Sequence, residues 1–286
     1  MSKSVVNLAE KEASRLLALW RIKHPEDINV ELIAKLCGAK VRDCTFSGAE
    51  ARLVRVGTKA IISISDAVRE VSRRRFDIAH EIGHLRLHLE SNAYKICSAD
   101  DMAVFGFEKS GLAQKEIEAN AFAAELLLPK QMLTSRIVGQ KPSLRLIEEL
   151  AHTFSTSLSA TARRYVSCCD ERCAVVFSQE GQIKSFAASD DFGFWIPVNQ
   201  QLSEYSLAFE YFKGNTLPDR AETIDAEAWL EGKFVDDAVI REHSKVLGSY
   251  GIVLSLLWIE AAIDEDEDDW DDSETFTPDG RYRRRD

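Results

Sequence analysis

The sequence lacks the long apolar segments that export or membrane insertion would require. Residues 1–4 contain no apolar signal core, and the longest apolar stretch, 251–263, is too short and too interrupted to span a bilayer. A glycine-rich phosphate loop and internal repeats are also missing. We therefore expect a cytoplasmic, globular protein. Its 286 residues, 45% hydrophobic and 29% charged, suffice for two or three folded units.

Cysteine is too scarce and too irregularly spaced for a disulfide framework. The chain has six cysteines, and the three within 168–173 form no Cys-x-x-Cys pair and have no histidine nearby. Reduced thiols are therefore expected, and a metal site at 168–173 is a minor alternative.

The chemistry of the chain is concentrated in 75–84, Arg-Phe-Asp-Ile-Ala-His-Glu-Ile-Gly-His, which contains a His-Glu-x-x-His motif. Residues four apart share one face of an α-helix, so His80 and His84 can bind the same cation. Glu81 lies one position further round the helix, where its carboxylate can take a proton from an attacking water. Chance spacing is the alternative, but the small and apolar neighbours fit a buried metal helix. The pattern predicts a metal-dependent hydrolase.

A third metal ligand must come from another part of the chain, because catalytic zinc usually takes three protein ligands and keeps one position for water. The strongest candidate is Glu116, which begins an alanine-rich segment of high helix propensity. Asn120 follows four residues later, where its amide can support a ligating histidine. Glu118 is an alternative ligand, although it lies on a different side of the predicted helix.

The two motifs together resemble the ImmA/IrrE family of metallo-endopeptidases. The matching segments are 76–88 and the pattern Glu-x-x-Ala-Asn-x-Phe-Ala-Ala-x-Leu-Leu-Leu-Pro at 116–129. The resemblance implies a zincin-like core with three metal ligands and a catalytic base, namely His80, His84, Glu116 and, as the base, Glu81. Family members cleave helix-turn-helix repressors of the Xre type and so switch on stress or mobile-element genes. Zinc is the expected ion, with manganese as the alternative.

Three further residues are weaker candidates. His88 continues the row of histidines, but its spacing differs from the His-x-x-Gly-x-x-His pattern, so we expect a polar wall or helix-end residue. An oxyanion-stabilising role stays open for His88, for Tyr94 and for backbone amides near the sheet edge. Cys97 lies between the two motifs, where the alternatives are a packing residue and an inhibitory metal contact.

Hydrophobic periodicity predicts two N-terminal helices, one at 8–20 and one that begins after a cap at Asn29. A small sheet follows, with 57–59 as the turn between strands 52–56 and 60–64. An unpaired edge of this sheet can bind extended substrate by β-augmentation.

Beyond Pro129, two helices at 144–154 and 158–166 resemble a helix-turn-helix. DNA binding does not follow, because acidic neighbours offset the arginines and leave no basic stripe. Strands at 174–177, 183–187 and 251–259 then indicate a small α/β domain, whose core we expect to contain the tryptophans Trp195, Trp229 and Trp258. A sensor or docking role for this domain rests on family analogy.

The predicted fold class is therefore α+β, with a zincin-like peptidase core, a helix-turn-helix-like module and a small α/β C-terminal domain. The predicted boundaries are 1–134, 135–170 and 171–263, followed by an acidic tail at 264–286. The tail holds 11 acidic and 4 basic residues, and so contributes −7 to the net charge of −11. Such a segment is expected to be disordered and solubilising, with mimicry of nucleic acid as the alternative.

The leading functional hypothesis is a metal-dependent endopeptidase that cleaves an Xre-type repressor. An alternative is a metal-binding regulator that sequesters a repressor without cleaving it, which the intact Glu81 disfavours. A DNA-binding regulator that acts through 144–166 is disfavoured by the lack of positive charge. We expect a protein partner and no direct contact with nucleic acid or membrane.

Overall fold

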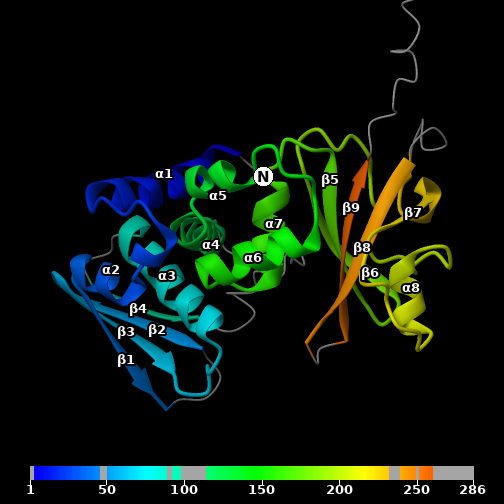
Figure 1. Ribbon diagram of the computed structural model, residues 1–286. Helices are drawn as coiled ribbons and strands as arrows, with labels where there is room; N and C mark the ends of the chain where they lie inside the picture. Colours follow the sequence, from blue (N-terminus) through cyan, green and yellow to red (C-terminus); the bar gives the residue numbers. More distant parts are fainter. Residues whose placement is uncertain are drawn as a thin grey trace, which may run out of the picture.

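The computed structural model describes residues 3–45, 50–88, 92–97, 114–231, 239–248 and 251–259. Figure 1 shows helices and a small sheet in the N-terminal half, further helices in the centre and a second sheet in the C-terminal half. This combination confirms the predicted α+β class. The predicted acidic tail lies outside the described residues. No helix in the described ranges is long and apolar enough to cross a membrane.

The N-terminal sheet has four strands in the order β1-β3-β2-β4. Their bounds are β1 Ala39–Cys44, β2 Ala51–Val56, β3 Lys59–Ser65 and β4 Asn92–Cys97. The predicted hairpin is confirmed as β2 and β3, and Gly57 turns the chain with a φ of +58°, a conformation that favours glycine. β1 runs parallel to β3, and β4 runs antiparallel to β2. The two edge strands of this sheet are therefore β1 and β4.

Four helices complete the N-terminal lobe, namely α1 Lys3–Leu19, α2 Val30–Leu36, α3 Val71–Leu87 and α4 Gln114–Leu127. Asn29 caps α2 as predicted, because its side chain accepts a hydrogen bond from the Leu32 N–H at 3.0 Å. Helix α3 is buried throughout 76–85, since it packs against α4 as well as the sheet. Gly83 permits this approach, because a Cβ there would lie 3.1 Å from the Ala119 Cα.

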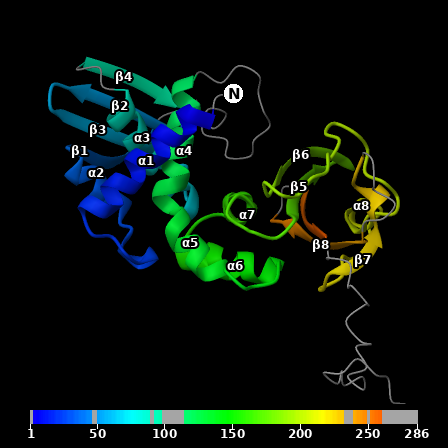
Figure 2. The ribbon, with the colours of Figure 1, turned by 90° about the horizontal axis from the view of Figure 1, so that it is seen from above.

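The central helices are α5 Lys130–Ile137, α6 Leu144–Phe154 and α7 Leu158–Val166. The predicted helix pair is confirmed, and Ser143 and Ser157 cap its members by accepting hydrogen bonds from backbone N–H groups. Phe154 and Val166 belong to the same hydrophobic core as the N-terminal helices. The predicted domain boundaries stay predictions. Figure 2 shows these helices between the N-terminal lobe and the second sheet.

The second sheet is antiparallel, with the strand order β6-β5-β9-β8-β7. Its elements are β5 Cys173–Gln179, β6 Gln182–Ala188, α8 Leu207–Phe212, β7 Glu222–Asp225, β8 Val239–Leu247 and β9 Ile252–Ile259. A short 3-10 helix lies at Ala226–Ala228 in this unit, and another lies at Pro25–Asp27 in the N-terminal half. Side chains alternate between the two faces of a sheet. Val175 and Phe177 accordingly join the first core, whereas Ala174 and Val176 join a second core.

The tryptophans of this C-terminal unit differ in burial. Trp229 is 2% exposed and lies in the second core, as predicted. The same prediction was wrong for Trp195, which is 58% exposed and contacts the Phe186 ring edge-on. Trp258 is partly buried against the first core. Composition alone gives no means to distinguish a core tryptophan from one on the outer face of a sheet.

Candidate metal centre

The two sequence motifs meet where α3 packs against α4. His80 and His84 lie on α3, and Glu116 lies in the first turn of α4. The Nε2 atoms of the two histidines are 3.0 Å apart, and each is 3.3 Å from Glu116 Oε2. All three side chains are buried. The three residues thus form a cluster that could hold a metal ion.

Asn120, one turn after Glu116, fixes the orientation of His80. Its Oδ1 lies 2.8 Å from His80 Nδ1. A carboxamide oxygen can only accept, so Nδ1 carries the ring hydrogen and Nε2 keeps its lone pair. That lone pair belongs to the atom that faces the cluster. Asn120 therefore lies where a residue supporting a ligating histidine was predicted.

A second series of hydrogen bonds, through His88 and Glu118, orients His84. His88 is the C-cap residue of α3, and its Nδ1 lies 2.9 Å from His84 Nδ1. Its Nε2 is 2.8 Å from Glu118 Oε2 and donates to that carboxylate. Neutral His88 can then accept at Nδ1 from the His84 Nδ1–H, which leaves a lone pair on His84 Nε2. The sequence predicted a polar helix-end residue at His88 but not this contact.

Glu118 is not part of the cluster, although it was an alternative ligand. Burial raises its pKa, but the hydrogen bonds from His88 and Gln114 outweigh burial and lower it below the ordinary value. An ionised Glu118 is a good acceptor for the His88 Nε2–H. Glu118 thus contacts His88, and His88 contacts His84. These contacts lie on the side of the His84 ring away from Glu116.

The cluster fits a tetrahedral cation. Zinc binds imidazole nitrogen and carboxylate oxygen at about 2.0–2.2 Å, which places tetrahedral ligand atoms about 3.3–3.6 Å apart. The observed separations of 3.0, 3.3 and 3.3 Å are close to that range. Three buried ligand atoms this close together, in the tautomers that Asn120 and His88 favour, suit a shared cation. Nitrogen and oxygen donors of this kind suit zinc and also manganese.

Two more buried carboxylates, Glu81 and Asp77, lie on α3. Glu81 is fully buried next to His80. Asp77, one turn earlier, is also fully buried, and its Oδ1 lies 3.2 Å from Arg73 Nε. Burial raises the pKa of Asp77 to about 7, although Arg73 opposes the rise. The sequence prediction missed Asp77, and a charged residue within an apolar stretch was the available signal.

The remaining candidates lie away from the cluster or cannot be placed. Tyr94 and Cys97 are on β4, where their backbones pair with Val54 and Ala51. Cys97 therefore lies in a strand. The side chains of β4 are not among the described parts, so their roles stay predictions. Within the described ranges, the three thiols of 168–173 are not part of a metal-ligand cluster.

An α+β domain whose packed helices carry a His-His-Glu cluster is typical of metallopeptidases. Residues 35–165 match the family model Peptidase_M78, the IrrE N-terminal-like domain. The matched range contains both sequence motifs. The chain therefore carries an IrrE N-terminal-like domain, and the resemblance to the ImmA/IrrE family is confirmed.

A solved structure with a similar fold is a Mycobacterium tuberculosis transcriptional regulator. The similarity covers 90% of this chain and 77% of that chain, with a TM-score of 0.52 and 15% sequence identity. At this identity the likeness shows a shared fold. No curated protein matches the sequence.

Proposed function

We propose that this protein is a metal-dependent endopeptidase that cleaves a protein substrate. His80, His84 and Glu116 are the proposed metal ligands, and Glu81 is the proposed catalytic base. The observation that carries the proposal is the convergence of three atoms with lone pairs at separations that suit a tetrahedral cation. The match of 35–165 to a peptidase family supports the same function.

The proposed roles of the side chains follow from their positions. When bound, the metal ion supplies a Lewis acid that polarises the scissile carbonyl and activates the attacking water. Glu81 accepts a proton from that water and passes it to the leaving amine. Asn120 and His88 keep the two ligating rings in the required tautomer.

Substrate binding is proposed along the edge strand β4, which can pair with an extended chain. His88 is a poor oxyanion donor, because both of its ring nitrogens already face His84 and Glu118. Tyr94 and backbone amides therefore stay the candidates for that role.

The proposed substrate is an Xre-type helix-turn-helix repressor, and the proposed ion is zinc, with manganese as the alternative. The substrate class is supported by the family resemblance. A regulatory setting is also consistent with the structural neighbour, which is a transcriptional regulator. A repressor substrate would place the protein in the cytoplasm.

The test is incubation of the purified protein with candidate Xre-type repressors and zinc or manganese, followed by mass spectrometry of the fragments. Glu81→Gln should keep the metal and lose at least about a thousandfold in cleavage rate, because only the base is removed. Glu149→Gln, a change at an exposed position on α6, is the matched control and should cleave normally.

Three outcomes separate the hypotheses. Cleavage by wild type and not by Glu81→Gln supports the endopeptidase. A repressor that is captured intact by the metal-loaded wild type would favour the sequestering regulator instead. Equal cleavage by Glu81→Gln would remove Glu81 from the catalytic role.

A further inference from the structure

A cleft of about 1210 Å³ lies between the peptidase core, the central helices and the β8–β9 hairpin. Helices α3 and α4 form one wall, α7 forms another, and 245–248 of the hairpin close the third side. Most small-molecule pockets measure about 300–1,000 Å³. The cleft therefore has room for a segment of polypeptide.

One end of the cleft comes near the metal centre, although His80, His84 and Glu116 do not line it. Asn120 lines the cleft, and its Oδ1 is the atom that contacts His80 Nδ1. Phe76 lines it as well, with its ring centroid 6.1 Å from that of His80. The cleft therefore ends one side chain away from a proposed metal ligand. A polypeptide that binds at the metal can continue into this space on one side of the scissile bond.

Apolar side chains form much of the cleft wall. They come from α4, α7 and the hairpin, and they are Leu127, Leu128, Leu158, Val246 and Leu247. Such a wall accepts apolar side chains of a bound segment.

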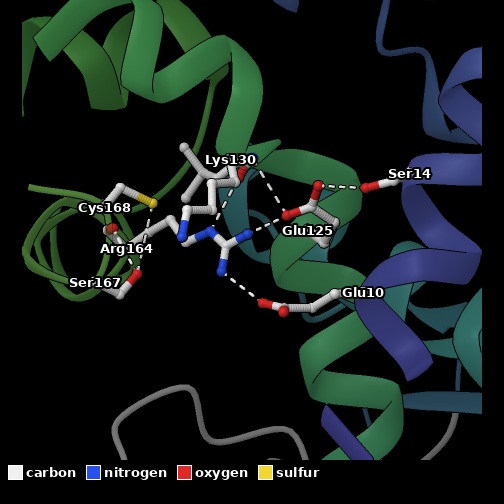
Figure 3. Close-up of polar contacts among 8 residues, drawn as sticks. Glu10, Ser14, Glu125, Lys130, Arg164, Ser167 and Cys168 are labelled. Carbon is white, nitrogen blue, oxygen red and sulfur yellow. Dashed lines mark hydrogen bonds and ion pairs between the residues drawn. The ribbon is translucent and has the colours of Figure 1, made fainter. Parts of the chain in front are cut away.

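Most cations of the cleft wall already have anionic partners. Figure 3 shows Arg164, whose Nη1 donates to Glu10 Oε1 at 2.7 Å and whose Nη2 pairs with Glu125. Its Nε donates to the Leu128 carbonyl, and Ser14 donates to the other oxygen of Glu125. This network fastens α7 to α1 and α4. All three guanidinium nitrogens of Arg164 are thus bound within the protein, and its charge is paired with two carboxylates.

The other charged pairs of the wall are also internal. Arg73 binds Glu50, and Lys245 binds Glu148. Glu70 is exposed, where water solvates its charge. These groups add little net charge to the interior of the cleft.

Arg163 differs from all of these cations. Its Nη2 donates to Ser185 Oγ at 2.6 Å, and its guanidinium carbon lies 4.3 Å from the Phe177 ring centroid. Its Nε is buried without a hydrogen-bond partner, and no carboxylate pairs with it among the residues whose positions are described. Burial lowers the pKa of Arg163 to about 10, which still leaves the side chain charged near neutral pH. A partly buried cation of this kind is stabilised by an anion that enters the cleft.

We propose that the cleft binds a segment of the protein substrate beside the scissile bond, and that Arg163 selects an acidic side chain within that segment. The inference rests on the proposed peptidase function and adds a substrate class to it. Preferred substrates carry Asp or Glu at a fixed distance from the cleaved bond, with apolar residues nearby. The carboxylate accepts hydrogen bonds from the terminal nitrogens of the Arg163 guanidinium.

The test is cleavage-site profiling with a peptide library prepared from a whole-cell proteome and read by mass spectrometry. Zinc-loaded wild type should enrich Asp or Glu at one fixed position relative to the cleaved bond. Arg163→Gln should lose that enrichment. For two synthetic library peptides that differ only by Glu or Gln at this position, the wild-type ratio of kcat/KM should be roughly ten- to a hundredfold and should fall to near one in the variant.

Controls distinguish charge selection from damage to the fold. Arg145→Gln removes an exposed arginine of α6 that does not line the cleft, so it should keep the acidic preference. Bound zinc and thermal unfolding are measured for each variant. The wild-type profile is informative even if Arg163→Gln does not fold, because it requires no variant.

Cleavage without any acidic preference, or a preference unchanged in folded Arg163→Gln, would overturn the role of Arg163 and leave the peptidase function intact. Failure of the wild type to cleave any library peptide or repressor would count against the peptidase function. Retention of library peptides on immobilised zinc-loaded Glu81→Gln then tests the cleft separately. Enrichment of acidic peptides that disappears with Arg163→Gln supports the cleft, and retention independent of Arg163 contradicts it.

Discussion

Glu116 and Glu242 are both buried glutamates, but the groups around them differ in kind. Glu116 faces the Nε2 atoms of His80 and His84, which present lone pairs in the tautomers that Asn120 and His88 favour. Glu242, on β8, accepts hydrogen bonds at 2.6–2.9 Å from four donors: the backbone N–H groups of Leu207 and Ala208, Trp229 Nε1 and Ser244 Oγ. A carboxylate surrounded by donors is complete without a ligand, whereas one that faces other acceptors requires a cation.

The donors around Glu242 also explain its structural role. Leu207 and Ala208 begin α8, so the carboxylate joins this helix to the second sheet. Burial raises the pKa of Glu242, and the four hydrogen bonds oppose that rise. Burial of an acidic residue therefore does not by itself identify a functional site. The hydrogen-bonding character of its neighbours does.

A large loss of stability is expected for Glu242→Ala. Removal of the carboxylate leaves several buried donors unpaired, so the free energy of unfolding should fall by about 3 kcal/mol. Zinc affinity should not change, because the metal centre lies on α3 and α4. Urea unfolding of the metal-free protein, followed by tryptophan fluorescence, measures the effect. Glu227→Ala, at an exposed position of the same unit, is the control, and an equal loss in both variants would contradict a special role for Glu242.

A smaller effect, on zinc affinity, is expected for His88, which contacts the proposed ligand His84. His88→Ala removes the acceptor for the His84 Nδ1–H, so zinc affinity should fall roughly ten- to a hundredfold. Competition with a chromogenic chelator measures the affinity. The matched control is His152→Ala, which changes an exposed histidine of α6. Unchanged affinity in His88→Ala would show that the His84–His88–Glu118 chain does not orient the ligand.

A third effect, on the pH dependence of stability, is expected for Asp77. Its folded-state pKa of about 7 lies above its ordinary value of 3.8, chiefly because of burial. Between these values the folded protein keeps a proton that the unfolded chain releases, so stability falls as the pH rises. The slope is at most about 1.4 kcal/mol per pH unit.

Asp77→Asn cannot titrate and should remove this part of the pH dependence. The measurement is the free energy of unfolding of both metal-free proteins at several pH values across the window set by the ordinary value of 3.8 and the folded-state value of about 7. The difference between variant and wild type should grow with pH. A difference that stays constant across the window would show that Asp77 is ionised in the folded protein.

Much of the metal centre could be predicted from local spacing. The four-residue repeat of an α-helix places His80 beside His84, and the same repeat places Asn120 one turn after Glu116. Capping residues and glycine turns likewise predicted α2, α6, α7 and the β2–β3 hairpin. These features depend on neighbours that are near in sequence.

The parts that sequence reasoning missed depend on contacts between distant segments. Glu118 meets His88 only because α4 packs on α3. Arg163 lies in a cleft wall only because α7 packs between the peptidase core and the second sheet, where Ser185 and Phe177 contact it. Strand order is non-local for the same reason. No periodicity within one segment encodes the parallel pairing of β1 with β3.

Calorimetric titration of the metal-free protein with zinc measures whether His80, His84 and Glu116 together bind a metal ion. We expect wild type to bind one ion per chain, and Glu116→Ala to lose about a hundredfold or more in affinity because a ligand is removed. Glu242→Ala should bind zinc like wild type. Absence of zinc binding by wild type, or equal affinity of wild type and Glu116→Ala, would contradict the account.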